Sequence, residues 1–212
     1  MDVSSTKRKP VARRRPLERP DEILEAALEV FGTNGLASAR MADIAERAGV
    51  AKGTVYLYFE TKDELFRAVV RKTIGDAVAA MSEASVGDTA RGRLQALMPA
   101  LWDILRSPQF HTVYRLVYAE LHHFPELTRF YSDEVAAGSL SSYIAEEIRQ
   151  GIDEGEFRDV DPVVTARMLL ALFVKHAVWL SRPDLFRHVA SRSAEAVLND
   201  ITDFFFAALR RS

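Results

Sequence analysis

The sequence contains no cysteine, which excludes disulfides and thiolate metal sites and is typical of a protein in a reducing compartment. It also has no uninterrupted apolar run long enough to span a bilayer, because the longest candidate, residues 163–180, contains Arg167, Lys175 and His176. The basic N-terminus lacks the apolar segment of a signal peptide. We therefore expect a soluble, cytoplasmic protein with no membrane partner.

Two further absences bear on fold and chemistry. No segment shows the apolar–polar alternation of a strand, whereas helical spacing of apolar residues recurs along the chain, so the sequence predicts an all-α fold. A Gly-rich phosphate loop, a nucleophile elbow and a zinc-protease motif are missing. Residues 120–123 form one Glu-x-x-His, but the second copy that a di-iron bundle needs is lacking. We expect no enzyme, no cofactor and no metal site.

Residues 41–65 carry the most specific pattern in the chain. Apolar residues at helical spacing predict a short helix that begins at Met41, and Gly49 suits the left-handed position that ends a helix. Residues 52–59 predict a second short helix. Two short helices joined through a glycine turn are the pattern of a helix-turn-helix, whose second helix enters the major groove of DNA.

Positive charge gathers in the N-terminal third. Residues 1–72 carry 14 Lys and Arg against 11 Asp and Glu, whereas the rest of the chain is acidic. This asymmetry is consistent with a nucleic-acid-binding end joined to an acidic body. Residues 1–19 hold seven of these cations, broken by Pro10 and Pro16, and have no apolar face, so we expect a disordered arm. Whether this arm follows DNA phosphates or is a solvated tail stays open.

The rest of the chain predicts a helical body. One helix begins at Pro20, before the helix-turn-helix, and a long one capped by Thr61 runs to about Glu83. Cap residues and helix-starting prolines then predict helices over residues 88–105, 109–122, 125–150, 162–180 and 193–210. We divide the chain into an arm (1–19), a DNA-binding domain (20–66) and a helical ligand-binding and dimerisation domain (67–212).

With these residues in view, the sequence resembles the tetracycline-repressor (TetR) family of bacterial transcriptional regulators. The likeness rests on ILEAALEVFGTNG (23–35), MADIAERAGVAKGTVYLYF (41–59) and TKDELF (61–66), with a weaker match at RLVYAELHHFPEL (115–127). The family implies a homodimer of about nine helices per subunit. Three helices form the DNA-binding head, the body holds a ligand pocket, and the last two helices form a four-helix dimer interface.

The resemblance also implies a function. We expect a repressor that binds a palindromic operator as a homodimer and is released by an unknown small molecule. The alternative is a DNA-binding regulator, or DNA-organising protein, that has no small-molecule inducer and is controlled by a protein partner.

The DNA-contact candidates are Arg40, Lys52, Gly53, Thr54, Tyr56, Leu57, Tyr58 and Lys62. Lys52 can donate to guanine, Leu57 can pack on a thymine methyl group, and Gly53 permits close approach of the backbone. The hydroxyl groups suit phosphate contacts, as does Lys62 at the start of the next helix. Alternatively, Tyr56 is a core ring with only its hydroxyl exposed, and the two lysines are solvated surface residues.

Two positions depart from the family pattern. Arg40 and Ala51 stand where a hydroxyl residue usually caps each short helix, and neither side chain can accept a hydrogen bond there. Each loss costs about 1 kcal/mol. Arg40 can instead contact a DNA phosphate.

Aromatic and polar side chains of the body are the ligand-pocket candidates: Trp102, Phe110, His111, Tyr114, Arg115, Tyr118, His122, Tyr143, His176 and Trp179. Those at 111, 114, 115, 118 and 122 share one helical face. Arg115 can pair with a carboxylate ligand or equally with Glu120, and a plain aromatic core with an internal ion pair is the alternative. Apolar residues of the last two long helices are the dimer-interface candidates: Met168, Leu172, Phe173, Val197, Ile201 and Phe205.

Overall fold

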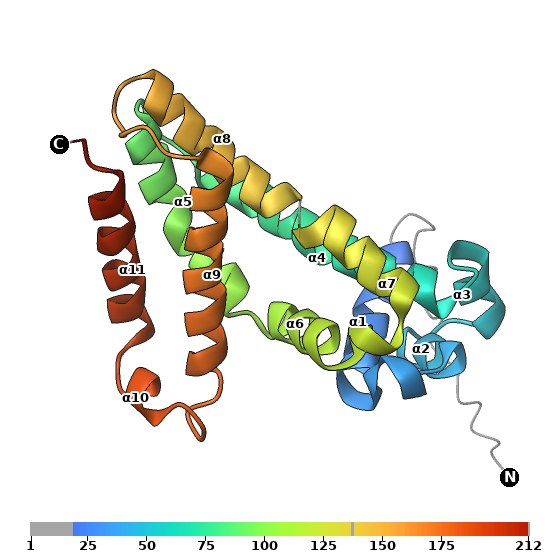
Figure 1. Ribbon diagram of the computed structural model, residues 1–212. Coiled ribbons are helices and arrows are strands. Elements are labelled where there is room, and N and C mark those ends of the chain that lie inside the picture. The colour runs from blue at the N-terminus through green and yellow to red at the C-terminus, as the bar shows by residue number, and fades with distance from the viewer. Residues whose placement is uncertain (1–18, 137, 212) are drawn as a thin grey trace, which may run out of the picture.

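The computed structural model describes residues 19–136 and 138–211, and every regular element in those two ranges is a helix. The predicted all-α fold is confirmed. Figure 1 shows α4 as a long connector between a group of short helices at the N-terminal end and a bundle of longer helices that includes α5, α9 and α11.

The N-terminal region folds into α1 (Arg19–Ser38), α2 (Met41–Arg47), α3 (Lys52–Tyr58) and α4 (Lys62–Ala84). Within α1 the helix is interrupted, because Gly35 adopts φ 76° and ψ 162°, a conformation that residues with a Cβ rarely adopt. The sequence predicts that this helix ends at residues 32–35. The structure instead has a kink at Gly35, and a short helical stretch continues from there to Ser38.

Four predicted helix starts are confirmed. Thr61, Ser107, Asp161 and Ser193 cap α4, α6 (Pro108–Glu120), α9 (Pro162–Leu180) and α11 (Ala194–Leu209), respectively. Each cap side chain accepts a hydrogen bond from a backbone amide two or three residues further on. These bonds satisfy amides that have no partner within the helix itself.

One helix begins slightly later than the sequence predicts. The capping residue of α5 (Ala90–Leu105) is Thr89 rather than Asp88, since the Thr89 hydroxyl accepts a hydrogen bond from Gly92 N at 3.0 Å. A 3₁₀ turn over Leu121–His123 and the four-residue α10 (Arg187–Ala190) were not expected.

The single helix predicted over residues 125–150 is wrong. The structure has α7 (Pro125–Phe130), a π-helical turn (Tyr131–Ala136) and α8 (Ser139–Asp153) in its place. Gly138, with φ −110° and ψ −136°, lies outside the helical region, and glycine is a poor helix former. Apolar periodicity continues on both sides of this residue, which is why the break was not predicted.

Buried apolar side chains form two cores. The head core joins α1, α2, α3 and the first half of α4 to α6 and α7, and within it the Phe31 and Phe66 rings pack edge to face, 5.9 Å apart. The body core joins the end of α4 to α5, α8, α9 and α11 around Trp102 and Phe173, whose rings lie 5.5 Å apart. Helix α6 therefore packs with the N-terminal helices, although the division at residues 66 and 67 assigned it to the body.

Helix α9 is the one described helix long and apolar enough to cross a membrane. It packs against α8 and α11 in the bundle, and Leu169 and Phe173 on its inner side are fully buried. Its other side remains exposed at Val163, Val164 and Met168.

Candidate nucleic-acid interface

The turn between α2 and α3 has the geometry that the sequence predicts. Gly49 adopts φ 66°, and its amide donates to Glu46 O at 3.1 Å. The next amide, of Val50, donates to Ala45 O at 3.0 Å, which closes the end of α2. Ile44 and Val55 are fully buried, so each short helix is held against the head core by its inner face. Together α2 and α3 form a helix-turn-helix.

The outer face of α3 is left exposed. Leu57 is 79% exposed and Tyr56 43% exposed, so the alternative that Tyr56 is a core ring is not supported. The Lys52 ammonium lies 5.7 Å from the centre of the Tyr56 ring, where a cation–π contact holds it on this face. A Cβ placed on Gly53 would meet nothing within 4 Å, so the protein itself gives no steric reason for a glycine there.

The missing caps are confirmed. Neither Arg40, before α2, nor Ala51, before α3, makes a side-chain capping bond. Both residues are exposed, and both have an extended backbone that leads directly into the helix. Arg40 is thus an exposed cation directly before the helix-turn-helix.

Lys62 has an internal role in addition to the predicted one. Its ammonium donates to Ala37 O at 2.9 Å and to Ala39 O at 3.2 Å, so it holds the chain that leaves α1. An ammonium has three donors, and one remains for another acceptor. Thr54 and Tyr58 are half-buried, and Tyr58 also packs against the head core.

Two side chains of α6 attach to the kink of α1. The Glu120 carboxylate accepts from Leu36 N at 2.7 Å and from Ala37 N at 3.3 Å, so it caps the helical stretch that follows Gly35. On the other side of the kink, Arg115 donates to Gly32 O. Arg115 and Glu120 therefore bind backbone groups of α1 instead of pairing with each other. We call this pair of contacts the α1–α6 latch.

Two family models together span most of the chain. The model for bacterial regulatory proteins of the tetR family matches residues 23–69, and the model for the C-terminal domain of AefR-like transcriptional repressors matches residues 92–211. The chain belongs to the TetR family. Family members are transcription regulators, not enzymes, in agreement with the sequence.

Similar proteins of known name are regulators as well. A fatty acid metabolism regulator protein of Bacillus subtilis (strain 168) is 27% identical over 150 residues, which is 70% of this chain and 76% of the relative. The transcriptional activator FasR of Mycolicibacterium smegmatis is 36% identical over 102 residues, 48% of this chain and 46% of the relative. The solved structure of the fatty acid degradation regulator FadR from Bacillus halodurans has a TM-score of 0.70 at 19% identity, covering 91% of this chain and 96% of that one. At this identity the structural likeness shows the TetR fold alone.

Four ligand candidates of this TetR-family body meet in one groove. His111, Tyr114, Arg115 and Tyr118 of α6 face Val178, Ser181 and Arg182 at the end of α9, around a volume of about 520 Å³. The Tyr114 and Tyr118 rings lie 4.3 Å apart. We call this site the α6 groove. It shares Arg115 with the α1–α6 latch.

The charge of the α6 groove comes from arginine. Burial lowers the pKa of His111, and burial raises the pKa of Tyr114, so both side chains are neutral near pH 7. Arg182 is paired with Asp184 at 2.9 Å, whereas Arg115 donates to a neutral carbonyl. His111 Nε2 is buried and has no hydrogen-bond partner in the part of the chain that the structure describes.

The other six ligand candidates lie outside this groove: Trp102, Phe110, His122, Tyr143, His176 and Trp179. Trp102 belongs to the body core, and Tyr143 packs against that core. His176 and Trp179 pair with each other on α9, with ring centres 5.0 Å apart. His122 is exposed beside His123. The structure therefore does not bring the ten candidates into one pocket.

Most dimer-interface candidates also need reassignment. Four of them are buried in the body core of the single chain: Phe173, Val197, Ile201 and Phe205. A side chain covered by its own chain cannot also offer its surface to a partner, so we correct these four to core positions. Met168 is 63% exposed and Leu172 is partly buried. Phe204, which was not a candidate, is 65% exposed.

Two residues of the site were missed by the sequence for different reasons. Glu120 contacts amides 83 and 84 residues away, and no local pattern reports such a pair. Phe204 could have been predicted from the sequence, because three consecutive phenylalanines at 204–206 place apolar side chains on more than one face of α11. Within the described residues, no group of three or more His, Cys, Asp or Glu is placed to hold a metal ion.

Proposed function

We propose that this protein is a ligand-responsive transcriptional repressor that binds a palindromic DNA operator as a homodimer. The observation that carries the proposal is the outer face of α3, where Leu57 is exposed and Gly53 is surrounded by open space. An exposed leucine and an exposed lysine on the second helix of a helix-turn-helix suit base edges in the major groove. Membership of the TetR family supports DNA as the partner.

Each DNA-contact candidate takes one role in this proposal. Lys52 and Leu57 read bases, and Gly53 lets the backbone approach them. The remaining candidates position the head on phosphates: Arg40, Thr54, Tyr56, Tyr58 and Lys62. Lys62 also holds the end of α1, so replacing it removes an internal contact together with any phosphate contact.

The proposed dimer is formed by the exposed sides of α9 and α11. These two helices lie side by side at one end of the molecule, far from the helix-turn-helix (Figure 1). Met168 and Phe204 supply large apolar groups on that face, with Leu172 beside them. A two-fold dimer places two heads on one side of the DNA, where successive major grooves are about 34–36 Å apart.

The proposed switch is the α6 helix. A ligand in the α6 groove would contact Arg115 and Tyr118, and the same helix holds α1 through the latch. A ligand releases DNA only if it binds more tightly to the conformation whose heads do not match the operator. The α6 groove would therefore favour one head position over another through α6.

We further propose that the ligand is a largely apolar molecule with an anionic group. Arg115 supplies the charge, and Tyr114 and Tyr118 supply apolar surface. The name of the Bacillus subtilis relative, a fatty acid metabolism regulator, supports a fatty-acid-like ligand. The relatives include an activator, FasR, so that this protein represses rather than activates transcription is itself part of the proposal.

The Gly53→Ala variant tests the DNA contact. In the free protein, an added Cβ meets nothing within 4 Å, and alanine in a helix is favoured over glycine by about 1 kcal/mol. We expect a protein at least as stable as the wild type whose affinity for DNA from its own upstream region falls about tenfold or more, measured by fluorescence anisotropy. One tenfold step corresponds to about 1.4 kcal/mol.

Gly75→Ala is the matched control. Gly75 is an exposed glycine in α4 that also has open space around its Cβ position, but it lies away from α3. This variant should gain stability and keep full DNA affinity. Unchanged DNA binding by Gly53→Ala would remove α3 from the interface.

A further inference from the structure

A second cavity lies next to the α6 groove and shares only Thr112 with it. It has a volume of about 820 Å³ and lies between α1, α4 and the turn from α5 into α6. This volume is within the range of about 300–1,000 Å³ that small-molecule sites occupy. We call it the junction cavity, because α1 and the first half of α4 belong to the head core whereas α5 belongs to the body core.

The wall of the junction cavity is apolar on its inner side. Leu24 and Leu28 of α1 face Val69 and Ala77 of α4, and Ile104 at the end of α5 adds a fifth apolar group. Val69 and Ala77 are buried, and the two leucines are only partly covered by the head core. An apolar ligand body of several carbons would cover this surface.

Acidic side chains dominate the charge of the same cavity. The lining contains three acids, Glu25 and Glu29 of α1 and Asp76 of α4, and one cation, Lys72. Lys72 is already held by Asp76 at 3.2 Å and by Asp21 at 3.6 Å, and the hydrogen bond to Asp76 raises its pKa. Its charge is therefore neutralised within the protein, and the cavity as a whole is negative.

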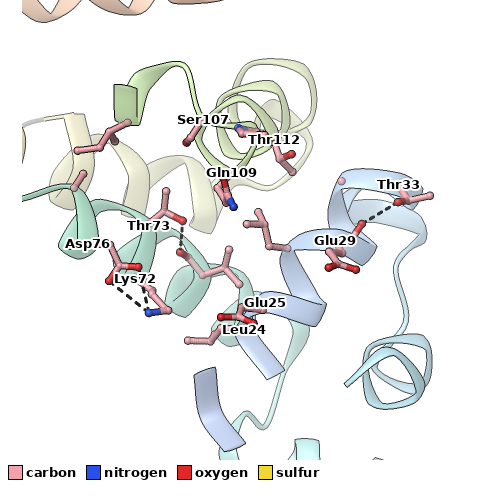
Figure 2. Close-up of a pocket in the computed structure, with 16 residues that line it drawn as sticks. Leu24, Glu25, Glu29, Thr33, Lys72, Thr73, Asp76, Ser107, Gln109 and Thr112 are labelled. Atoms are coloured by element: carbon pink, nitrogen blue, oxygen red, sulfur yellow. Dashed lines mark hydrogen bonds and ion pairs between the residues drawn. The ribbon is translucent and has the colours of Figure 1, made fainter. Parts of the chain in front are cut away.

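Glu25 and Gln109, both exposed, line the cavity with side chains that are unpaired within the part of the chain that the structure describes. Glu29 is paired with Arg47, but Glu25 has no hydrogen-bond or ion-pair partner within residues 19–136 and 138–211. The same is true of the Gln109 amide. In Figure 2, Gln109 points from α6 into the space between α1 and α4, and Glu25 lies on α1 across that space.

The geometry points to a binding site for a small organic cation with an apolar body, in the junction cavity between α1, α4 and the α5–α6 turn. Its positive group lies against Glu25, Gln109 offers its amide oxygen, and its apolar part covers Leu24, Leu28 and Val69. A multiply charged hydrophilic cation would leave the apolar wall uncovered, and an anion would meet the unpaired Glu25 carboxylate.

Occupation of the junction cavity bears on the position of the head. The cavity ends where α1 and α6 touch, because a Cβ on Gly32 would lie only 3.0 Å from Thr112 Cγ2. A molecule that fills the space beside this contact fixes the distance from α1 to α4 and α6. The site therefore acts on DNA binding as a second regulatory site, distinct from the α6 groove; this step rests on the proposed DNA binding, whereas the cation site itself does not.

The binding test uses 4-phenylbutyltrimethylammonium as the probe, with 4-phenylbutanol and 4-phenylbutyrate as its neutral and anionic counterparts. Isothermal titration calorimetry on the full chain should show binding of the cation, weaker binding of the alcohol and none of the carboxylate. Glu25→Gln should weaken the cation about fivefold without affecting the alcohol, because it removes one exposed ion pair. Gln109→Trp should abolish both, because the indole fills the cavity from an exposed position.

Matched controls keep the test decisive. Glu83→Gln removes one exposed carboxylate of α4, and Gln95→Trp places an indole on the exposed side of α5; neither residue lines the cavity. Both controls should bind the cation as the wild type does. Equal binding of the three probes, or full cation binding by both Glu25→Gln and Gln109→Trp, would overturn the proposed site.

The regulatory step has its own readout. Saturating probe should change operator affinity at least threefold in the wild type and not in Gln109→Trp, and operator DNA should change probe affinity by the same factor. Probe binding with unchanged operator affinity would overturn the regulatory role. Loss of all operator binding would instead count against the proposed function, and calorimetry would still decide the cation site.

Discussion

The two cores of this protein differ in what they leave exposed. The head core combines the N-terminal helices α1 to α4 with α6 and α7, and it leaves the outer face of α3 exposed. The body core buries one side of α9 and α11 and leaves a second apolar side uncovered. Because α6 packs in the head core, the ligand proposed for the α6 groove would act on the head directly rather than only through α4.

The largest expected effect separates the two sides of α11. Phe205 is 4% exposed and packs on Phe206 in the body core, whereas its neighbour Phe204 is 65% exposed. We expect Phe205→Ala to lower the free energy of unfolding by about 3–5 kcal/mol, as for other buried phenylalanines. Thermal or denaturant unfolding at fixed protein concentration measures this loss.

Phe204→Ala is the counterpart of that variant. It should change the stability of the subunit by no more than about 0.5 kcal/mol, but it should weaken the dimer in sedimentation experiments. If Phe204→Ala leaves the dimer intact at all concentrations, the interface lies elsewhere and the exposed side of α11 needs another explanation.

The next effect concerns the α1–α6 latch within the head core. Glu120→Ala leaves the Leu36 and Ala37 amides without their acceptor, which costs about 1–3 kcal/mol where such groups are not rehydrated. We expect faster hydrogen exchange at these two amides and weaker operator binding, since the end of α1 leads directly into α2. Hydrogen exchange followed by NMR resolves the two amides.

Glu126→Ala is the control for the α1–α6 latch. Glu126 is an exposed acid of α7 that pairs with Arg129 at 3.2 Å. An exposed pair of this kind contributes at most about 1 kcal/mol. Equal hydrogen exchange in the Glu120 and Glu126 variants would show that the latch does not hold α1.

Local rules explain what the sequence predicts well. Four helix starts are predicted from the sequence because a capping side chain bonds to amides only two or three residues away. The capping residues are Thr61, Ser107, Asp161 and Ser193. The turn at Gly49 is predicted for the same reason, since one residue needs a positive φ.

Long-range packing explains what the sequence does not predict. The apolar stripe of α11 was assigned to the dimer, yet Val197, Ile201 and Phe205 serve the subunit's own core. A stripe of helical spacing shows that a face is buried but does not show which surface buries it. The latch and the junction cavity likewise depend on how α1 and α6 meet, and no local pattern carries that information.

The smallest expected effect tests the missing caps of the helix-turn-helix. Arg40→Thr restores a capping hydroxyl before α2 and should raise stability by about 1 kcal/mol. If Arg40 contacts a phosphate, the variant should also lose about one unit from the slope of log affinity against log salt concentration. Ala51→Ser restores the cap of α3 without removing a charge, so it should gain similar stability with no change in salt slope. Titrations of both variants at several salt concentrations separate cap from charge, and an unchanged slope for Arg40→Thr would leave Arg40 without a role in DNA binding.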